Sequence, residues 1–293
     1  MTPESLGTFL RTRRSRVTPE LVDLSSTLTT RRVPGLRREE LAQLAGVSVG
    51  YYTRLEQGQA GTASQQVLNA LARVLRLDAA ESAHLHNLAR QPTTPKITRP
   101  APEQLDSRVL ALLKSLRETI PAIILGRRGD VLAWNHSGHE LVAEHLDFDA
   151  PQDIHNRPSI PRLFFLDSLT RDLYQNWDEL ARIHVAYLRL TSGRYPTDGR
   201  LAELIGELTI RSNEFATMWA TGDVADCTVG TLDLHHPTLG AVNVDYQVWV
   251  QPESPDHRLE IYTPNDVESQ DALRLLPSGF TAARSAGQLR TNA

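Results

Sequence analysis

Arginines suited to binding phosphate gather in the first ninety residues of this 293-residue chain. Arg37 and Arg38 open one stretch of helical apolar spacing, Arg54 lies in the next, and Arg31 and Arg32 precede both. A guanidinium group is a planar fork of N–H donors that matches two phosphate oxygens, or the O6 and N7 acceptors of guanine. The chemistry that these residues favour is binding to a nucleic acid.

The stretch that must position these arginines, residues 36–58, has the pattern of two short helices joined by a tight turn. Gly46 lies between them, where the turn needs a positive φ, while Ser48 is placed to cap the second helix and Gly58 to end it. The apolar residues at helical spacing are Leu41, Ala42, Ala45, Val47, Tyr52 and Leu55. This pattern predicts a helix-turn-helix, whose second helix enters the major groove of DNA.

Two alternatives stay open for this region. A helical hairpin that binds no DNA has the same apolar spacing, but the apolar residues occupy the opposite faces and leave the arginines to solvent, which favours DNA. Residues 17–35 form a polar connection that is longer than a compact bundle needs. This connection is either a solvated loop or a loop that reaches DNA phosphates through Arg31 and Arg32.

The remaining pattern of residues 1–90 predicts an all-α bundle that serves as the DNA-binding domain. Further helices are expected at residues 4–16, at 64–75 with Ser64 as its cap, and at 78–89. The segment holds twelve arginines, no lysine and eight acidic residues, a net charge of +4, whereas residues 91–293 carry −8. A basic end on an acidic body suits a protein that contacts DNA with one domain only.

Composition and missing motifs exclude several function classes. No apolar run is long enough to span a membrane and no apolar leader opens the chain, so we expect a cytoplasmic protein without a membrane partner. The single cysteine, Cys227, rules out an internal disulfide and is expected to be a small buried strand residue. The chain has no phosphate-binding glycine loop, no His-Glu-x-x-His and no Gly-x-Ser-x-Gly, so we expect no enzyme and no cofactor.

The second part of the chain predicts an α+β domain over residues 103–277, after a proline-rich linker at 91–102. A helix near 103–118, a mostly helical stretch over 136–221 and a helix near 268–276 accompany strands at 121–125, 130–135, 227–236, 241–250 and 258–263. This order favours an antiparallel sheet of about five strands with helices on one face, and a small ligand between the layers. Residues 278–293 are expected to be a disordered tail.

One cluster offers a different chemistry. His136, His139 and Glu140 share a face if their segment is helical, a spacing that a metal ion accepts. Gly138 weakens that helix, and no further ligand is assignable from elsewhere, so a solvated helix face is favoured and no metal is expected. A metal-dependent enzyme fused to a DNA-binding domain remains an alternative.

Motifs along nearly the whole chain resemble those of known regulators. In the first domain they are Pro34–Glu40, Gly46–Gly58 and Leu68–Leu75, and in the second they are Ala133–Asn135, Phe164–Asp167, Arg211–Phe215 with Trp219, and His236–Pro237. The first domain is similar to Xre-type helix-turn-helix regulators related to phage repressors, and the whole chain resembles the MmyB-like transcription regulators. This resemblance implies a PAS-like second domain that senses a ligand, and some relatives bind fatty-acid-like molecules.

The phage-repressor pattern also implies roles for individual residues. It directs Ser48, Val49, Gly50 and Arg54 toward base edges, and Arg37, Arg38 and Gln57 toward phosphates. A bidentate bond from Arg54 to guanine is worth about 1–3 kcal/mol, whereas Val49 and Gly50 replace amide side chains and weaken direct readout. The same pattern pairs Arg14 with Glu56 in a structural role.

For the second domain we expect an apolar ligand between the sheet and the helices. Asn135 and Arg211 are the polar candidates for its head group, although Arg211 equally suits a structural ion pair. The expected lining residues are Trp134, Phe164, Phe165, Leu166, Tyr187, Phe215, Trp219 and Tyr246. Aromatic residues at such spacings also suit a packed core, so a C-terminal domain that only dimerises is an alternative; double-stranded DNA and a second copy of the chain are the expected partners.

Overall fold

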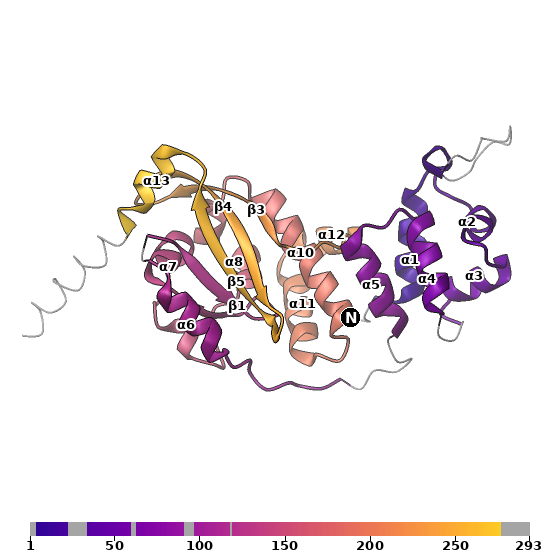
Figure 1. Ribbon diagram of the computed structural model, residues 1–293, viewed down its shortest axis with the longest axis horizontal. Coiled ribbons are helices and arrows are strands. Elements are labelled where there is room, and N and C mark those ends of the chain that lie inside the picture. The colour runs from indigo at the N-terminus through magenta and orange to yellow at the C-terminus, as the bar shows by residue number, and fades with distance from the viewer. Residues whose placement is uncertain (1–3, 23–33, 60–62, 91–96, 118, 277–293) are drawn as a thin grey trace, which may run out of the picture. The chain divides into compact units, whose positions relative to one another are not determined.

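The computed structural model describes residues 4–22, 34–59, 63–90, 97–117 and 119–276 (Figure 1). Arg31, Arg32 and the predicted tail at 278–293 lie outside the described residues. The chain divides into two compact units. The first comprises Met1–Arg99, Val185–Gly206 and Met218–Asp226, and the second comprises Pro100–His184, Glu207–Thr217 and Cys227–Ala293. The predicted linker at 91–102 stays a prediction. Its described part pairs with residues 197–199, where the Thr98 N–H donates to the Thr197 carbonyl at 2.8 Å.

The N-terminal region is helical, as predicted. Its elements are α1 (Leu6–Arg16), a 3₁₀ turn η1 (Pro19–Val22), α2 (Arg38–Ala45), α3 (Val49–Glu56), α4 (Gln65–Val74) and α5 (Ala79–Arg90). Ser48 and Ser64 confirm their predicted caps, accepting bonds from the backbone N–H groups of Tyr51 at 3.2 Å and Val67 at 3.3 Å. Each serine satisfies one of the N–H groups that a helix start leaves unpaired.

The core of this helical region lies between α1, α2, α3, α4 and α5. Its largest fully buried side chains are Phe9, Leu10, Leu36, Leu41, Tyr52, Leu55, Leu71 and Leu85. Helix α1 crosses α3 so closely that a Cβ on Gly7 would lie 2.1 Å from the Glu56 carbonyl oxygen. Val224, from a much later part of the chain, is buried in the same core, and Leu190 packs against it.

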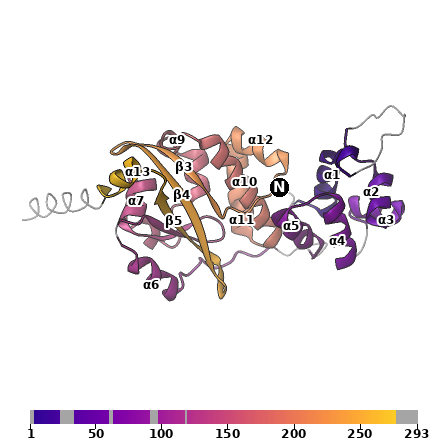
Figure 2. The same cartoon turned by 45° about the horizontal axis from the view of Figure 1, so that its top comes forward.

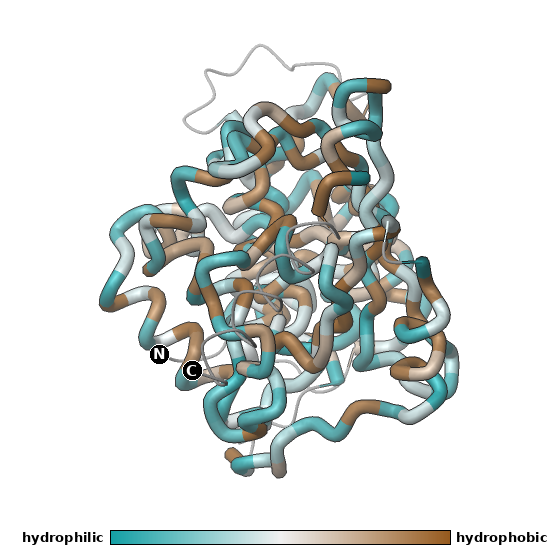
Figure 3. The backbone as a smooth tube through the Cα atoms, turned by 90° about the vertical axis from the view of Figure 1, so that its left-hand side faces the viewer, coloured by the Kyte–Doolittle hydropathy of each residue, from teal (hydrophilic) through white to brown (hydrophobic). Residues whose placement is uncertain are grey.

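The second unit contains the predicted antiparallel sheet of five strands. The strands are β1 (Ala122–Leu125), β2 (Val131–Trp134), β3 (Val229–His236), β4 (Gly240–Gln251) and β5 (Ser254–Pro264), in the order β2-β1-β5-β4-β3. Apolar residues alternate along residues 242–250 of the sequence. Val242, Val244 and Tyr246 are buried on one face of β4, whereas Val250 near its end is exposed. Figure 3 shows hydrophobic and hydrophilic residues interspersed along the backbone.

Helices surround this sheet and connect its two halves. They are α6 (Ser107–Ser115), α7 (His136–Ala143), α8 (Ile160–Leu166), α9 (Ser168–Leu173), α10 (Trp177–Arg194), α11 (Gly199–Arg211), α12 (Asn213–Thr221) and α13 (Val267–Leu273), with a 3₁₀ turn η2 (Ala150–Gln152). Helix α9 lies beside β3, where Tyr174 bridges to Leu234 (Figure 2). Helices α10, α11 and α12 each contribute residues to both compact units.

The helices of the second unit lie mainly on one face of the sheet, but α6 covers part of the other. Ile123 faces residues of α7, α8 and α10, whereas its neighbours Ala122 and Ile124 pack with Val109 and Leu113 of α6. Alternate residues of a strand point to opposite faces, so the four buried residues of β1 mark a strand covered on both sides. The prediction of helices on one face therefore describes the main layer and omits α6.

Candidate nucleic-acid interface and ligand cavity

The helix-turn-helix has the geometry that residues 36–58 predict. Gly46 adopts φ 69° and ψ 31° at the end of α2, a left-handed conformation that favours glycine. The next helix, α3, begins at Val49 after the Ser48 cap and ends at Glu56, with Gly58 also at positive φ. The turn thus sets the direction of α3 relative to α2.

One edge of α3 is open to solvent while the other is buried in the core. The residues expected at base edges or phosphates on this element, Ser48, Val49, Gly50, Arg54 and Gln57, are all exposed. Arg37 is also exposed at the start of α2. A Cβ on Gly50 would meet no atom within 4 Å, so nothing covers the helix there. Their contact with DNA remains a prediction.

Arg38 has an additional role that its sequence position alone does not indicate. Its Nε donates to Glu56 Oε2 at 2.7 Å, and the Arg14 Nε donates to Oε1 of the same carboxylate at 2.7 Å. The Tyr52 hydroxyl donates to Oε1 at 2.8 Å, and Arg14 also donates to the Leu36 carbonyl at 2.7 Å. The Arg14–Glu56 pair implied by the resemblance is confirmed. We call Arg14, Arg38, Tyr52 and Glu56 the Glu56 cluster.

The Glu56 cluster keeps a buried carboxylate ionised. Burial alone would raise the pKa of Glu56, but hydrogen bonds from Arg14, Arg38 and Tyr52 outweigh it, and the pKa lies below its ordinary value. Burial together with the charge of Glu56 raises the pKa of Tyr52, so its hydroxyl remains a donor. The cluster ties α1 and the start of α2 to the last residue of α3, which fixes the exposed edge of α3.

A cavity of about 30 Å³ lies between the sheet and the helices of the second unit. Phe164 and Tyr246, two of the expected lining residues, face it. The other lining residues are Ile123, Val142, Ile160, Tyr174, Leu180, Ile183, His184, Cys227, Leu232, Glu260 and Tyr262. One water molecule occupies about 30 Å³ in the liquid, so this cavity has room for roughly one water.

Polar groups at this cavity are ones that sequence reasoning missed. Burial raises the pKa of Glu260, which accepts a hydrogen bond from the Tyr262 hydroxyl at 3.2 Å. Burial and nearby Arg258 lower the pKa of His184 to about 3, so its imidazole is neutral. The Cys227 sulfur lies 3.3 Å from the Tyr246 hydroxyl. Cys227 is buried, as expected, but it precedes β3 and is not the strand residue that the sequence predicts. The alternation of β5 offered a signal, because Glu260 falls on its inward face beside Tyr262.

Several expected lining residues have structural roles instead. Asn135 Oδ1 accepts bonds from the backbone N–H groups of Gly138 and Ala122, both at 2.9 Å, and its Nδ2 donates to the Ile120 carbonyl at 2.7 Å. Its amide therefore caps α7 and joins it to β1. The Trp134 indole donates to the Phe148 carbonyl at 2.8 Å.

The aromatic residues of α8 and α12 pack against one another. The Phe165 ring meets Phe215 edge-on with centroids 5.1 Å apart, and meets Trp177 at 5.7 Å. Leu166 and Tyr187 are half-buried. Trp219 belongs to a different and larger cavity in the first unit. Of the aromatic residues expected to line the ligand site, the structure therefore brings only Phe164 and Tyr246 to the cavity at the sheet.

Arg211 is exposed, and it binds Glu207 one helical turn away, with Nη1 2.8 Å from Oε1. It takes the structural ion pair that the sequence left open, and it is not among the lining residues of the sheet cavity. The charged or titratable side chains that line the sheet cavity include Glu260 of β5 and His184 of α10, and not Arg211.

The histidine cluster is also used for packing. The His136 ring stacks on Phe148 with centroids 4.1 Å apart, and the His139 ring lies 4.8 Å from Trp134. Nε2 of His139 is 2.8 Å from the Leu146 carbonyl. Over the described ranges, no group of three or more His, Cys, Asp and Glu side chains is placed to hold a metal ion.

A helix-turn-helix followed by a sheet domain is an architecture of ligand-responsive DNA-binding transcription regulators, and two family profiles support this class for the chain. Residues 5–85 match a helix-turn-helix domain profile, and residues 105–276 match the MmyB-like transcription regulator ligand binding domain. The chain belongs to the MmyB-like transcription regulators. No curated protein matches it. Among the helices of the described residues, none is long and apolar enough to cross a membrane.

Proposed function

We propose that the chain is a cytoplasmic regulator that binds double-stranded DNA as a homodimer, with α3 in the major groove. The observation that carries this proposal is the exposed edge of α3, where Ser48, Val49, Gly50 and Arg54 are uncovered while Tyr52 and Leu55 are buried. Arg54 is the base-reading side chain, and Arg37 and Gln57 bind phosphates. Arg38 contributes less to DNA affinity, because Glu56 already binds its guanidinium.

Two arginine variants separate base reading from phosphate binding. On an operator obtained by in vitro selection, Arg54→Ala should relax base preference at one position of each half-site, at a cost of about 1–3 kcal/mol. Arg37→Ala should weaken binding to all sequences and reduce the salt slope by about one. Arg73→Ala, which removes an exposed arginine of α4, is the matched control and should leave binding unchanged. Equal losses for Arg54→Ala and Arg37→Ala on every sequence would contradict these roles.

We propose that a small apolar, fatty-acid-like ligand enters between the sheet and the helices. Burying about ten methylenes yields roughly 8 kcal/mol, which exceeds the lower estimates of the cost of association, about 4 kcal/mol. The cavity of about 30 Å³ does not accommodate such a chain as it stands, so Phe164 and its neighbours must change rotamer. The ligand therefore stabilises a more open arrangement of this layer.

The two adjacent phenylalanines of α8 test this site. Phe164→Ala enlarges the cavity, whereas Phe165→Ala removes a ring that packs on Trp177 and Phe215. Dodecanoate should raise the unfolding temperature of Phe164→Ala more than that of the wild type or of Phe165→Ala. Native mass spectrometry of protein purified without added lipid should show a bound species. No bound species and no thermal shift in any of the three proteins would overturn the apolar ligand.

The small volume of the sheet cavity favours a second candidate, a C-terminal domain that only dimerises. Val229 pairs with Gln247, and Trp249 follows Gln247 by two residues. Both therefore lie on the face of the sheet opposite to the buried Val244 and Tyr246. Both are exposed, at 69% and 60%. An exposed apolar patch on a sheet face suits contact with a second copy. Trp249→Glu should then give a monomer by light scattering, while Ile210→Glu, an exposed apolar residue of α11, should not.

A further inference from the structure

The larger cavity, about 420 Å³, lies within the first unit. One wall is formed by Thr8 and Thr12, which lie one turn apart on the same face of α1, and by Glu4, which precedes the Ser5 cap of that helix. The other wall contains Leu201 and Trp219. This volume falls in the range of sites for small organic molecules, which runs from about 300 to 1,000 Å³. Neither the sheet cavity nor the DNA interface contributes to it.

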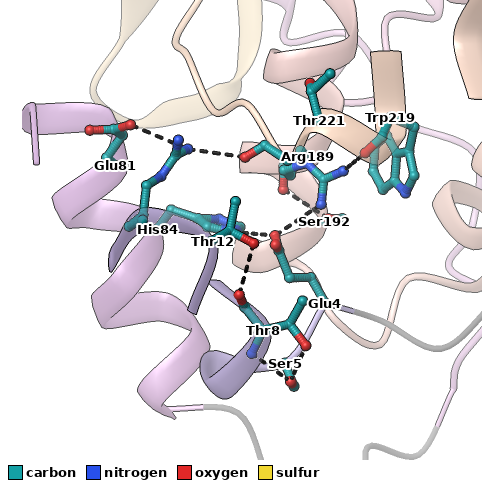
Figure 4. Close-up of polar contacts among 12 residues, drawn as sticks. Glu4, Ser5, Thr8, Thr12, Glu81, His84, Arg189, Ser192, Trp219 and Thr221 are labelled. Carbon is teal, nitrogen blue, oxygen red and sulfur yellow. Dashed lines mark hydrogen bonds and ion pairs between the residues drawn. The ribbon is translucent and has the colours of Figure 1, made fainter. Parts of the chain in front are cut away.

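Among the described residues that line this cavity, Arg189 is the only cation. Both of its Nη atoms are engaged (Figure 4), while its Nε is buried without a hydrogen-bond partner. Its Nη1 lies 3.0 Å from Glu4 Oε2, and its Nη2 donates to the Trp219 carbonyl. The guanidinium also stacks over the Trp219 ring, 4.2 Å from the ring centroid. An anionic ligand would have to displace Glu4 to bind Nη1 of Arg189.

Glu4 supplies an ionised carboxylate with an open oxygen. Burial raises its pKa, but hydrogen bonds and charge from His84 and Arg189 outweigh this effect and bring the pKa below its ordinary value. The contact with His84 Nε2, at 3.1 Å, also uses Oε2 (Figure 4). Among the described residues, Oε1 of Glu4 accepts no hydrogen bond. This oxygen is therefore available to a donor in the cavity.

The charge balance of the lining favours a cation. Among the described residues that line the cavity, Glu4 and Asp198 are acidic and Arg189 is basic, a formal balance of −1, and Asp198 also accepts the backbone N–H groups of Arg200 and Leu201. The start of α1, the feature that would attract an anion, is already capped by Ser5, whose hydroxyl accepts from the Thr8 backbone N–H at 3.1 Å. Leu201, Ala202 and Ile205 provide an apolar surface that faces this charge.

We propose that this cavity is a second effector site, which binds an organic ammonium ion with an apolar or aromatic body. The ammonium group donates to Glu4 Oε1 and the Thr8 hydroxyl, and the body packs against Trp219 and Leu201. Thr8 comes from the region that matches the helix-turn-helix profile, which begins one residue after Glu4, and Trp219 and Leu201 come from the region that matches the ligand binding domain. A bound ligand thus connects residues of both regions within one compact unit.

Matched indole probes test the proposal on the full chain by calorimetric titration. Tryptamine, a cation, should bind at least tenfold more tightly than 3-(indol-3-yl)propionate, the corresponding anion, a difference of about 1.4 kcal/mol. Glu4→Gln should reduce this preference. Because Glu4→Gln also removes the charge that pairs with Arg189, Thr8→Val, which deletes only a hydroxyl at an exposed position, provides a second test of tryptamine affinity.

A blocking variant locates the site. Ala202→Trp fills the cavity from an exposed position and should abolish tryptamine binding, whereas Ala111→Trp on α6, also exposed, should leave it unchanged. Absence of tryptamine binding, equal affinity for the two probes, or full binding by Ala202→Trp would each overturn the proposal. Ala202→Trp should retain operator affinity and the response to dodecanoate, so failure of this site is distinguishable from failure of the proposed function.

Discussion

The replacement of Glu56 by glutamine tests how the recognition helix is held. The carboxylate is 2% exposed and accepts hydrogen bonds from Arg14, Arg38 and Tyr52. Glu56→Gln keeps the shape of the side chain but removes the charge, which leaves the guanidinium of Arg14 without its counterion at a largely buried position. Breaking a buried ion pair by removing one partner costs about 3–5 kcal/mol. We expect the lower end, about 3 kcal/mol, because water still reaches Arg38.

Arg38→Ala should have a much smaller effect. Its side chain is 41% exposed, and Glu56 retains Arg14 and Tyr52 when Arg38 is removed. Exposed pairs contribute about 0–1 kcal/mol, since solvent screens their charges. Glu39→Gln, an exposed carboxylate on α2, is the matched control for the loss of charge and should be neutral.

Thermal unfolding measures the loss of stability in each variant. Hydrogen exchange measures the protection of the backbone amides in α1 and α3. For a unit of about 130 residues, a loss of 3 kcal/mol lowers the unfolding midpoint by roughly 10 °C. Equal destabilisation by Glu56→Gln and Arg38→Ala would refute the reasoning, since the predicted difference rests on burial. Loss of operator affinity should accompany loss of protection in α3.

The pH dependence provides an independent test of the same carboxylate. The pKa of Glu56 is lower in the folded protein than its ordinary value of 4.5. Its stabilising contribution is therefore complete above about pH 4.5 and is lost as the pH falls through the lower folded value. Glu56→Gln should lack this loss between pH 5 and more acidic conditions. A wild-type and variant difference that does not change with pH would contradict an ionised Glu56.

Three further predictions follow from other parts of the structure. Gly50→Ala should stabilise α3 by about 0.5–1 kcal/mol in thermal unfolding, because its Cβ meets no atom within 4 Å, whereas Gly7→Ala should destabilise, because its Cβ would lie 2.1 Å from the Glu56 carbonyl. Because the pKa of His184 is lowered to about 3 in the folded protein, the unfolded state takes up the proton first as the pH falls. The free energy of unfolding should therefore fall from pH 6.5 toward pH 3, and in urea unfolding His184→Gln should reduce this dependence on pH. A fragment of residues 1–90 should show faster amide exchange in α1 than the full chain, because it lacks Val224 in its core and the bond from Arg13 to the Gly222 carbonyl; equal protection would contradict this.

The local features of the helix-turn-helix were predictable from the sequence because they depend on neighbouring residues. A glycine between two apolar-periodic stretches and a serine before the second are sufficient to place the turn and the cap of α3, at Gly46 and Ser48. The strand alternation of β4 and the turn before Gly240 depend on equally short patterns. Burial of one helix or strand face leaves a periodic signal that requires no knowledge of the partner.

The ligand site was predicted less well, because it depends on which distant residues meet. Aromatic residues indicate burial, but Phe164 lines the sheet cavity while Phe165, the next residue, packs on Trp177 and Phe215. Asn135 is a polar candidate for the ligand head group by residue type, yet its amide hydrogen-bonds to backbone groups. Residue type alone does not distinguish a polar group that faces a cavity from one that caps a helix.

The same limit explains why the first unit differs from the match to the helix-turn-helix profile. Arg13 donates to the Gly222 carbonyl at 3.0 Å, Arg16 pairs with Asp223 at 2.8 Å, and Val224 is buried in the core of α1–α5. The contacts of Arg13 and Arg16 span more than 200 residues of sequence, and Val224 is far in sequence from the rest of its core, so no local pattern reports these contacts. Residues 218–226 match the ligand binding domain by sequence but belong to the DNA-binding unit by packing. Helix α12 therefore contributes Phe215 to the second unit and its residues from Met218 onward to the first.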